Sequence, residues 1–489
     1  MKIIKLEIQN FRAFYGNHIL EFAKAGHRLT KQNLLLYGEN GSGKSSLLLA
    51  IQYALDSSRN TISFDEHKNI FQDPSCDRYI ELTLRKKTNQ PMITCKWSPE
   101  ITTTNILEIQ DASQAKGILD YKKLLEVHFI HRANQSVNIF DLLLKSLLEK
   151  CINDQDPDQK TFSEQWQTLL ESIPKRRNYS RQIDKFNGTA ALFNQGLSAK
   201  LNQLRESVNQ LMLYFGHSIK IAFDFQGISF DHEVKYDPNN PEKSLSGKEI
   251  LLNIEFLGRN ISQPHHFLNE AKLTAIAISL YLSSLLVAPK PALKILVLDD
   301  IFIGLDMQNR LPMIDILKEK FAEYQIFLMT YDREWYEVLK QRLDGNKWLF
   351  QELYRTELKE NDNVFAEIPV WKQDKDFLEK SEEYLEVHHE PRIAAVYLRM
   401  AFEVMLKKYC DEQRKKVIYK EERKKLSSDD FWTVIKNNIP SSLADDIEIY
   451  RNIVMNPLSH STIIQIHSQE VRLAIATVKQ LKDRLFPSS

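Results

Sequence analysis

The segment from Gly38 to Ser45 has the residue types and spacing of a loop that binds phosphate groups. It reads Gly-Glu-Asn-Gly-Ser-Gly-Lys-Ser and fills every fixed position of the pattern G-x-x-x-x-G-K-[ST]. Backbone N–H groups of such a loop converge on phosphate oxygens at the N-terminus of the following helix. The alternative is a glycine-rich turn that binds no ligand. The residues expected to hold the nucleotide are Gly38, Asn40, Gly41, Gly43, Lys44, Ser45 and Ser46, with Lys44 as a catalytic point charge and the Ser45 hydroxyl on Mg²⁺.

A second segment, residues 293–300, supplies carboxylates. It reads Leu-Lys-Ile-Leu-Val-Leu-Asp-Asp, an apolar run that ends in two acids. A buried parallel strand is apolar throughout, and ligands bind at the carboxyl ends of such strands. We therefore predict that Asp299 binds Mg²⁺ and that Asp300 is the catalytic base that orients the attacking water. The alternative is that both acids only cap the following turn.

The elements around these two segments predict an α/β fold. Residues 33–37 read as a short buried strand, and residues 45–55 have the apolar spacing of a helix. Further strands are expected at 79–84, 92–97, 219–225, 228–236, 249–256 and 325–330. Helical spacing dominates residues 137–217, with breaks near 154–158 and 173–174.

Three more stretches carry a family resemblance. Residues 267–273, which run into a helix at 274–286, resemble the signature segment of ABC-type ATPases of the SMC/RecF group. Residues 301–306 resemble the D-loop of these proteins, and residues 6–14 resemble the opening strand and turn of RecF-like heads. The resemblance covers about residues 1–350 and implies an ABC-type P-loop ATPase head that uses ATP and Mg²⁺.

The resemblance also implies roles for residues outside the phosphate loop. Such heads form an ATP-dependent dimer in which the signature helix of one head closes over the nucleotide of the other. By position, Asn269 would contact the γ-phosphate in trans, and Asp306 would couple the two sites and count as catalytic. Gln135 is the candidate for the Q-loop glutamine, with a plain polar loop residue as the alternative, and Arg12 in the opening turn is a further nucleotide-binding candidate.

Several positions depart from the family pattern. Asn269 stands at the usual signature serine, Ala271 at a glycine, and Asp300 at the usual glutamate. Asp332 follows the strand at 325–330 where relatives commonly have a switch histidine. Because aspartate reaches about one methylene less far than glutamate, the departures favour slow hydrolysis and a nucleotide-gated switch.

Composition limits the other classes of function. The 489 residues are 43% apolar, enough for two to four domains, and Lys plus Arg balance Asp plus Glu at 65 each. Any nucleic acid would therefore bind at local patches. The sequence shows no signal peptide and no apolar run that we expect to span a bilayer, so no membrane contact is predicted. The four cysteines have no Cys-x-x-Cys pairing, and we expect no zinc site, no disulfide framework and a cytoplasmic location.

We predict four regions. Residues 1–130 are the N-terminal half of the head with a β-rich lobe, 131–217 a helical insert, 218–355 the C-terminal half of the head, and 372–489 a separate helical domain. The insert is too short for the long arms of SMC proteins and is expected to be a compact helical hairpin. Its basic stretch at 175–177 is a candidate contact for nucleic acid, with a solvated helix face as the alternative.

The glycine-free C-terminal domain contains a second candidate site. Arg399 and Glu403 lie four residues apart on one helix face, and residues 451–460 end in His460. The arrangement resembles HEPN-type domains and the ABC-fused anticodon nucleases PrrC and RloC, which implies an RNase site at Arg399, Glu403 and His460. Histidine can act as a general acid or base, glutamate can share the proton, and arginine can stabilise a charged phosphorane. The alternatives are an ordinary helix ion pair and a surface histidine.

These features give three hypotheses. The first is a defence-type ATPase whose ATP-dependent head dimer, or higher oligomer, controls its own C-terminal RNase, with tRNA or DNA as a partner. The second is a sensor and scaffold that binds and restrains a separate toxin or nuclease subunit, as the resemblance to Septu, PARIS and retron systems implies. The third is a RecF-like DNA repair ATPase.

Overall fold

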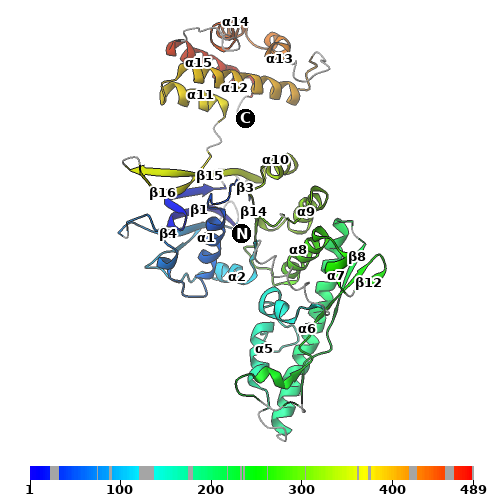
Figure 1. Ribbon diagram of the computed structural model, residues 1–489. Coiled ribbons are helices and arrows are strands. Elements are labelled where there is room, and N and C mark those ends of the chain that lie inside the picture. The colour runs from blue at the N-terminus through cyan, green and yellow to red at the C-terminus, as the bar shows by residue number, and fades with distance from the viewer. Residues whose placement is uncertain are drawn as a thin grey trace. The chain divides into compact units, whose positions relative to one another are not determined.

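The structure is a computed structural model (Figure 1). It describes residues 1–22, 32–73, 75–86, 91–120, 137–174, 180–216, 218–231, 234, 237–261, 263–302, 304–360, 363–372, 376–417, 427–456 and 467–486. The chain divides into two compact units, Met1–Lys372 and Gln373–Ser489. Each unit is considered by itself below.

A six-stranded sheet forms the centre of the first unit, with the strand order β16-β15-β3-β14-β13-β6. The strands are β3 (Asn33–Gly38), β6 (Gly117–Asp120), β13 (Ile295–Asp299), β14 (Gln325–Thr330), β15 (Trp348–Glu360) and β16 (Asn363–Trp371). All neighbours pair in parallel except β15 and β16, which form an antiparallel hairpin at one edge. The carboxyl ends of β3, β13 and β14 therefore lie along the same edge of the sheet.

A second, antiparallel sheet has the order β2-β1-β4-β5. Its strands are β1 (Lys2–Phe11), β2 (Phe14–Glu21), β4 (Tyr79–Arg85) and β5 (Ile93–Trp97), and the short helices beside it are η1 (Phe64–His67) and α2 (Leu107–Ala115). Helix α1 (Lys44–Asp56) shares one hydrophobic core with both sheets. The strands predicted at 79–84 and 92–97 are confirmed as β4 and β5.

The apolar central strands contribute to two cores because their side chains alternate between faces. Leu34, Leu36 and Val297 join α1 and the antiparallel sheet in one core. Leu35 and Leu298 point to the other face, where they join a larger core built mainly by helices. This two-sided burial explains why the sequence of these strands is apolar at consecutive positions.

Helix α8 (Glu270–Val287) and the 35-residue helix α6 (Ser180–Tyr214) lie against each other in this larger core (Figure 1). The other helices of the unit are α4 (Phe140–Leu142), the π-helical turn η3 (Leu143–Leu147), α5 (Phe162–Glu171), η4 (Pro241–Ser244), α7 (Pro264–Phe267), α9 (Met307–Lys320) and α10 (Arg333–Arg342). The remaining strands are β7 (Val137–Asn138), β8 (Ile219–Asp224), β9 (Ser229–Phe230), β10 (Leu245–Ser246), β11 (Leu251–Phe256) and β12 (Arg259–Ile261).

The helical segment predicted as an insert differs from a separate hairpin. Phe193 and Leu204 of α6 belong to the same core as Ile276 of α8 and Leu296 of β13. The helices of residues 137–216 therefore share the core of the first unit instead of forming their own core. Of the strand expected at 228–236, β9 covers Ser229–Phe230, and residues 232, 233, 235 and 236 lie outside the described residues.

Helix α8 corrects the expectation that the chain has no apolar run of membrane-spanning length. The described residues contain one helix, α8, that is long and apolar enough to cross a bilayer. In the structure, 78% of this helix is buried inside the protein. A helix that is apolar on all sides is expected where protein surrounds it.

The second unit is helical in all its described elements. They are α11 (Phe377–Glu386), α12 (Pro391–Glu412), α13 (Ser428–Ile435), η6 (Lys436–Asn438), α14 (Ser441–Tyr450), the π-helical turn η7 (Arg451–Met455) and α15 (Ser468–Leu485). They enclose a core of their own around Leu398, Phe402, Trp432 and Val471. Capping boxes start α11, α13 and α15, which is why these helices begin where they do.

Candidate nucleotide-binding site

The phosphate loop connects the carboxyl end of β3 to the N-terminus of α1. Gly41 and Gly43 have φ angles of +81° and +103°, which favour glycine. At Gly38 a Cβ atom would lie 2.4 Å from the Ser42 hydroxyl oxygen, so a side chain there would displace the loop. The three glycines therefore let the backbone fold tightly enough to direct its N–H groups toward one point.

Lys44 is the first residue of α1 and lies inside this loop. Its side chain is 5% exposed, and its ammonium donates hydrogen bonds to the carbonyl oxygens of Gly38 at 2.6 Å and Glu39 at 3.3 Å. The same ammonium lies 3.5 Å from the Asp300 carboxylate. A cation in this position can contact phosphate oxygens that approach the loop.

Ser45 joins the phosphate loop to the acidic strand end. Its hydroxyl donates a 3.0 Å hydrogen bond to Oδ2 of Asp299, a residue 254 positions later in the sequence. The other carboxylate oxygen of Asp299, Oδ1, is buried and has no hydrogen-bond partner among the described residues. Burial and the neighbouring Asp300 charge raise the pKa of Asp299 to about 6, against the opposing effects of Ser45 and Lys44.

Asp300 directly follows β13 and adopts a left-handed backbone conformation with φ of +52°. Aspartate tolerates this region better than most residues. Its Oδ1 accepts a 2.8 Å hydrogen bond from the backbone N–H of Tyr331, which fixes the carboxylate beside Lys44. Burial raises the pKa of Asp300, while Lys44 and the Tyr331 amide oppose the rise.

These residues fit a Mg²⁺-bound nucleoside triphosphate. Asp299 Oδ1 needs a buried partner, and a hydroxyl and a carboxylate are ligands that Mg²⁺ prefers. Asp120 at the end of β6 is in register with Asp299 and adds to the rise of its pKa. A divalent cation would remove this repulsion between carboxylates.

The hairpin of β15 and β16 covers the phosphate loop, which the sequence did not indicate. The Leu353 carbonyl oxygen lies 3.1 Å from the position that a Cβ atom would take at Gly38. The Pro369 Cβ lies 3.3 Å from the position that a Cβ atom would take at Gly43. The Arg355 guanidinium lies 3.8 Å from the corresponding point at Gly41 and pairs with Glu367 at 3.0 Å. Arg355 is therefore a candidate phosphate contact that no sequence motif predicted.

We expect Arg355→Ala to raise the ATP concentration needed for half-maximal turnover about 3- to 10-fold. The guanidinium is half-exposed and already paired, so its loss removes a solvent-screened interaction. Steady-state ATP titration measures the effect. Lys359→Ala removes a cation farther along the same hairpin and should leave the titration unchanged. Equal titrations for Arg355→Ala and the unaltered protein would rule out the contact.

The remaining predicted nucleotide-binding residues have fewer contacts. Asn40 is exposed in the loop, and Ser46 is half-buried in the first turn of α1. Arg12 is exposed in the turn after β1, where its backbone contacts His67 and Asn69 and not the phosphate loop. Gln135 lies outside the described residues, as does the basic stretch at 175–177.

The two residues expected to act across a dimer both cap exposed helix N-termini. Asn269 Oδ1 accepts a 3.1 Å hydrogen bond from the Lys272 N–H at the start of α8. Asp306 does the same for Asn309 at 3.0 Å at the start of α9. Arg310, the fourth residue of α9, donates a 2.5 Å hydrogen bond to Asp332, which caps α10. Asn269 and Asp306 are both exposed, so either helix N-terminus is accessible to a partner.

The topology and the site geometry agree with a comparison of the sequence with protein families. Residues 5–214 match the family model of an AAA domain. Together with the phosphate loop at the carboxyl end of β3, this match shows the α/β fold of a P-loop ATPase domain. The matched residues include the phosphate loop and end with α6, so the match does not reach the strand that carries Asp299. A search of curated proteins found no match.

Solved structures similar to the chain include three SMC head domains. An SMC head bound to the C-winged helix domain of ScpA is 12% identical, with a TM-score of 0.42, over 77% of this chain and 98% of that one. The SMC head from Thermotoga maritima is 13% identical, with a TM-score of 0.38, over 76% and 100%. A head with an extended coiled coil bound to the C-terminal domain of ScpA, derived from Pyrococcus furiosus, is 14% identical, with a TM-score of 0.39, over 79% and 99%.

In the second unit, the structure places only part of the predicted RNase site. Arg399 and Glu403 form an ion pair at 3.2 Å on α12, with both side chains about one third exposed. His460 lies outside the described residues. Arg451, in the same segment, is buried and pairs with Asp429 and with Glu448, so it serves the core.

Proposed function

We propose that this chain is an SMC/RecF-like ABC ATPase of a prokaryotic defence system, in which ATP-dependent pairing of two heads controls an effector. The observation that carries the proposal is the convergence of Lys44 and Ser45 with Asp299 and Asp300 from a distant strand. Buried free cysteines at 95, 151 and 410 suit a reducing cytoplasm. A RecF-like role in DNA repair would use the same head.

Each residue of the site has a role in this proposal. Lys44 and the loop N–H groups would hold the phosphates, and Ser45 and Asp299 would hold Mg²⁺, which neutralises phosphate charge when bound. Asp300 would orient the attacking water. Because Asp300 is already held by Tyr331 and Lys44, its short side chain has little freedom to reach toward that water. This constraint supports slow turnover and a long-lived closed state.

We expect Asn269→Arg to stop hydrolysis while the affinity of a single head for ATP changes less than about 2-fold. Residue 269 is exposed, so the longer cation would obstruct closure of two heads without disturbing the core. ATP affinity, turnover and mass by light scattering measure the three parts of this expectation.

The matched control is Asn269→Ser, which keeps a side chain that caps α8. This variant should hydrolyse ATP and form dimers at close to the normal level. Normal turnover in Asn269→Arg would contradict the head-dimer proposal, whereas loss of ATP binding in it would point to a local defect in the head.

The effector is either the second unit or a separate protein. The ion pair between Arg399 and Glu403 is compatible with the RNase hypothesis. A different observation favours the scaffold hypothesis: Ile393, Val396, Met400 and Val404 recur every three or four residues on α12 and are 39–50% exposed, although the opposite face of α12 already packs into the core. A partner subunit with an apolar surface would cover this face.

One comparison separates the two effector hypotheses. The purified chain is incubated with tRNA and ATP, and it is also co-expressed with the products of its neighbouring genes. RNA cleavage by the chain alone supports the first hypothesis. A stable complex with a neighbouring nuclease or toxin supports the scaffold hypothesis, provided that the double substitution Val396→Asp and Met400→Asp disrupts the complex.

A further inference from the structure

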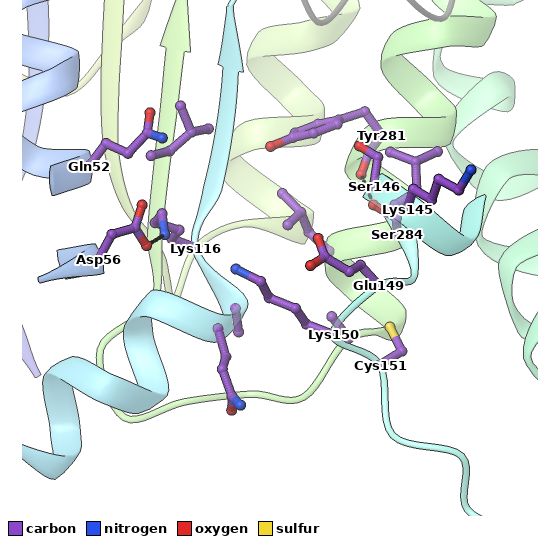
Figure 2. Close-up of a pocket in the computed structure, with 16 residues that line it drawn as sticks. Gln52, Asp56, Lys116, Lys145, Ser146, Glu149, Lys150, Cys151, Tyr281 and Ser284 are labelled. Atoms are coloured by element: carbon purple, nitrogen blue, oxygen red, sulfur yellow. Dashed lines mark hydrogen bonds and ion pairs between the residues drawn. The ribbon is translucent and has the colours of Figure 1, made fainter. Parts of the chain in front are cut away.

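The first unit contains a cavity of about 310 Å³ away from the phosphate loop (Figure 2). Its walls come from the last turns of α1, the segment from α2 to β6, η3 with the segment after it, and the C-terminal half of α8. This volume is at the lower end of the range for small-molecule sites. Ala115, Ile118, Leu147, Leu285 and Ala288 supply the apolar part of the walls.

On one side of the cavity, the charged side chains are paired with each other. Asp56, at the end of α1, forms an ion pair with Lys116 and accepts a 2.7 Å hydrogen bond from the Ser113 hydroxyl. Lys116 is 9% exposed and also donates to the Ser113 carbonyl oxygen at 3.0 Å. These groups are satisfied within the protein and form a fixed polar wall.

The neighbouring pair Glu149 and Lys150 is different. Both side chains are half-buried and extend into the cavity, between the Asp56–Lys116 pair and Tyr281 (Figure 2). Within the part of the chain that the structure describes, neither has an ion-pair partner within 4 Å. Lys150 has one long hydrogen bond, 3.4 Å to the Ser113 carbonyl oxygen. Among the described residues, the cavity therefore presents one cation and one anion that have no ion-pair partner.

A ligand that pairs with both Glu149 and Lys150 must carry one positive and one negative charge. Burying a single charge against either residue would leave the other unpaired, which is costly in a partly buried site. The amide of Gln52 offers an additional hydrogen bond at the wall (Figure 2). We propose that this cavity binds a small zwitterion of the amino-acid type, with its carboxylate on Lys150, its ammonium on Glu149 and its remainder against the apolar wall.

The position of the cavity connects it to the phosphate loop through one rigid element. The 13-residue helix α1 carries Lys44 at its first position and Asp56 at its last, about 18 Å apart along the helix axis. The ligand would therefore contact the opposite end of the helix that starts at the nucleotide site. Binding itself does not depend on the proposed ATPase function.

The experiment uses the full chain without nucleotide. Each of the proteinogenic L-amino acids is tested at millimolar concentration by thermal shift, and binding is confirmed by calorimetry. At least one should bind, and its N-acetyl and methyl-ester derivatives, which each lack one charge, should bind at least tenfold more weakly. Absence of binding by all the amino acids, or derivatives that both bind as tightly as the unmodified amino acid, would overturn the proposal.

The variants test the two contacts separately. Glu149→Gln is nearly isosteric, and both it and Lys150→Gln should weaken binding about tenfold or more. Lys145→Gln removes a cation at the exposed rim that already pairs with Asp141, and it should change the affinity less than about twofold. Unchanged affinity in both Glu149→Gln and Lys150→Gln would overturn the assignment. Because no step measures ATP turnover, failure here is distinct from failure of the proposed ATPase function.

Discussion

Replacing Lys44 with alanine is expected to weaken ATP binding on the order of 100-fold and to remove detectable turnover. Lys44 is the one side-chain cation in residues 38–46, and its ammonium already lies at the focus of the loop, 2.6 Å from the Gly38 carbonyl oxygen. Charge-assisted contacts with phosphate oxygens contribute roughly 3 kcal/mol at most, which corresponds to about two orders of magnitude in affinity. Without Lys44, the Asp300 carboxylate would also repel the phosphates uncompensated.

Fluorescent ATP titration and phosphate release measure this result. Lys347→Ala is the control, since it removes an exposed cation from the same unit. A Lys44→Ala protein with normal ATP affinity would mean that the triphosphate binds elsewhere in the chain.

Replacing Asp299 with asparagine is expected to have two opposite effects. Turnover that depends on Mg²⁺ should fall on the order of 100-fold or more, because an amide binds Mg²⁺ less well than a carboxylate. The nucleotide-free protein should become more stable above pH 6. Asparagine keeps an oxygen that can accept the Ser45 hydrogen bond and carries no charge to bury.

The direction of the pH effect follows from the raised pKa. The pKa of Asp299 is 3.8 in the unfolded chain and about 6 in the folded protein, so Asp299 binds its proton more tightly in the folded state. Its contribution to stability is therefore fully present below the unfolded pKa and is lost as the pH rises through 6, by about 3 kcal/mol.

Calorimetric unfolding between pH 4.5 and 8, without nucleotide, measures this loss. For a unit of this size, the difference corresponds to about 4 °C in Tm. The Asp299→Asn protein should show a flatter dependence on pH, with a residual slope from Asp300, whose pKa is also raised by burial. The same slope in both proteins would contradict the assignment of the raised pKa to Asp299.

Much of the phosphate site could be predicted from the sequence because its determinants are local. The apolar residues 34–36, the glycines that favour positive φ and the helix that starts at Lys44 all lie within one short segment, and the structure has β3 and α1 within a residue or two of the predicted bounds. The strand that ends at Asp299 was predicted for the same reason, since consecutive apolar residues are typical of a strand buried on both faces.

Other parts depend on pairings that no local pattern reveals. Arg355 lies over Gly41 only because β15 pairs in parallel with β3, and a strand of alternating polar residues gives no sign of its neighbour. Asp120 stands alone in its segment and becomes part of the site through register with Asp299. The place of α6 in the head core likewise depends on which apolar face it meets, which periodicity leaves open.

The hairpin over the phosphate loop also determines where the second unit begins. Pro369 lies against Gly43, and three residues later Lys372 donates to Glu352 at 3.0 Å. Burial alone would raise the pKa of Glu352, but Arg333, Tyr354 and Lys372 together lower it to about 2, which marks a firmly anchored end of the first unit.

At most about 10 Å of chain separates the loop contact from this anchor. A shift of the phosphate loop on nucleotide binding would therefore be transmitted directly to the attachment point of the second unit, whatever orientation that unit adopts.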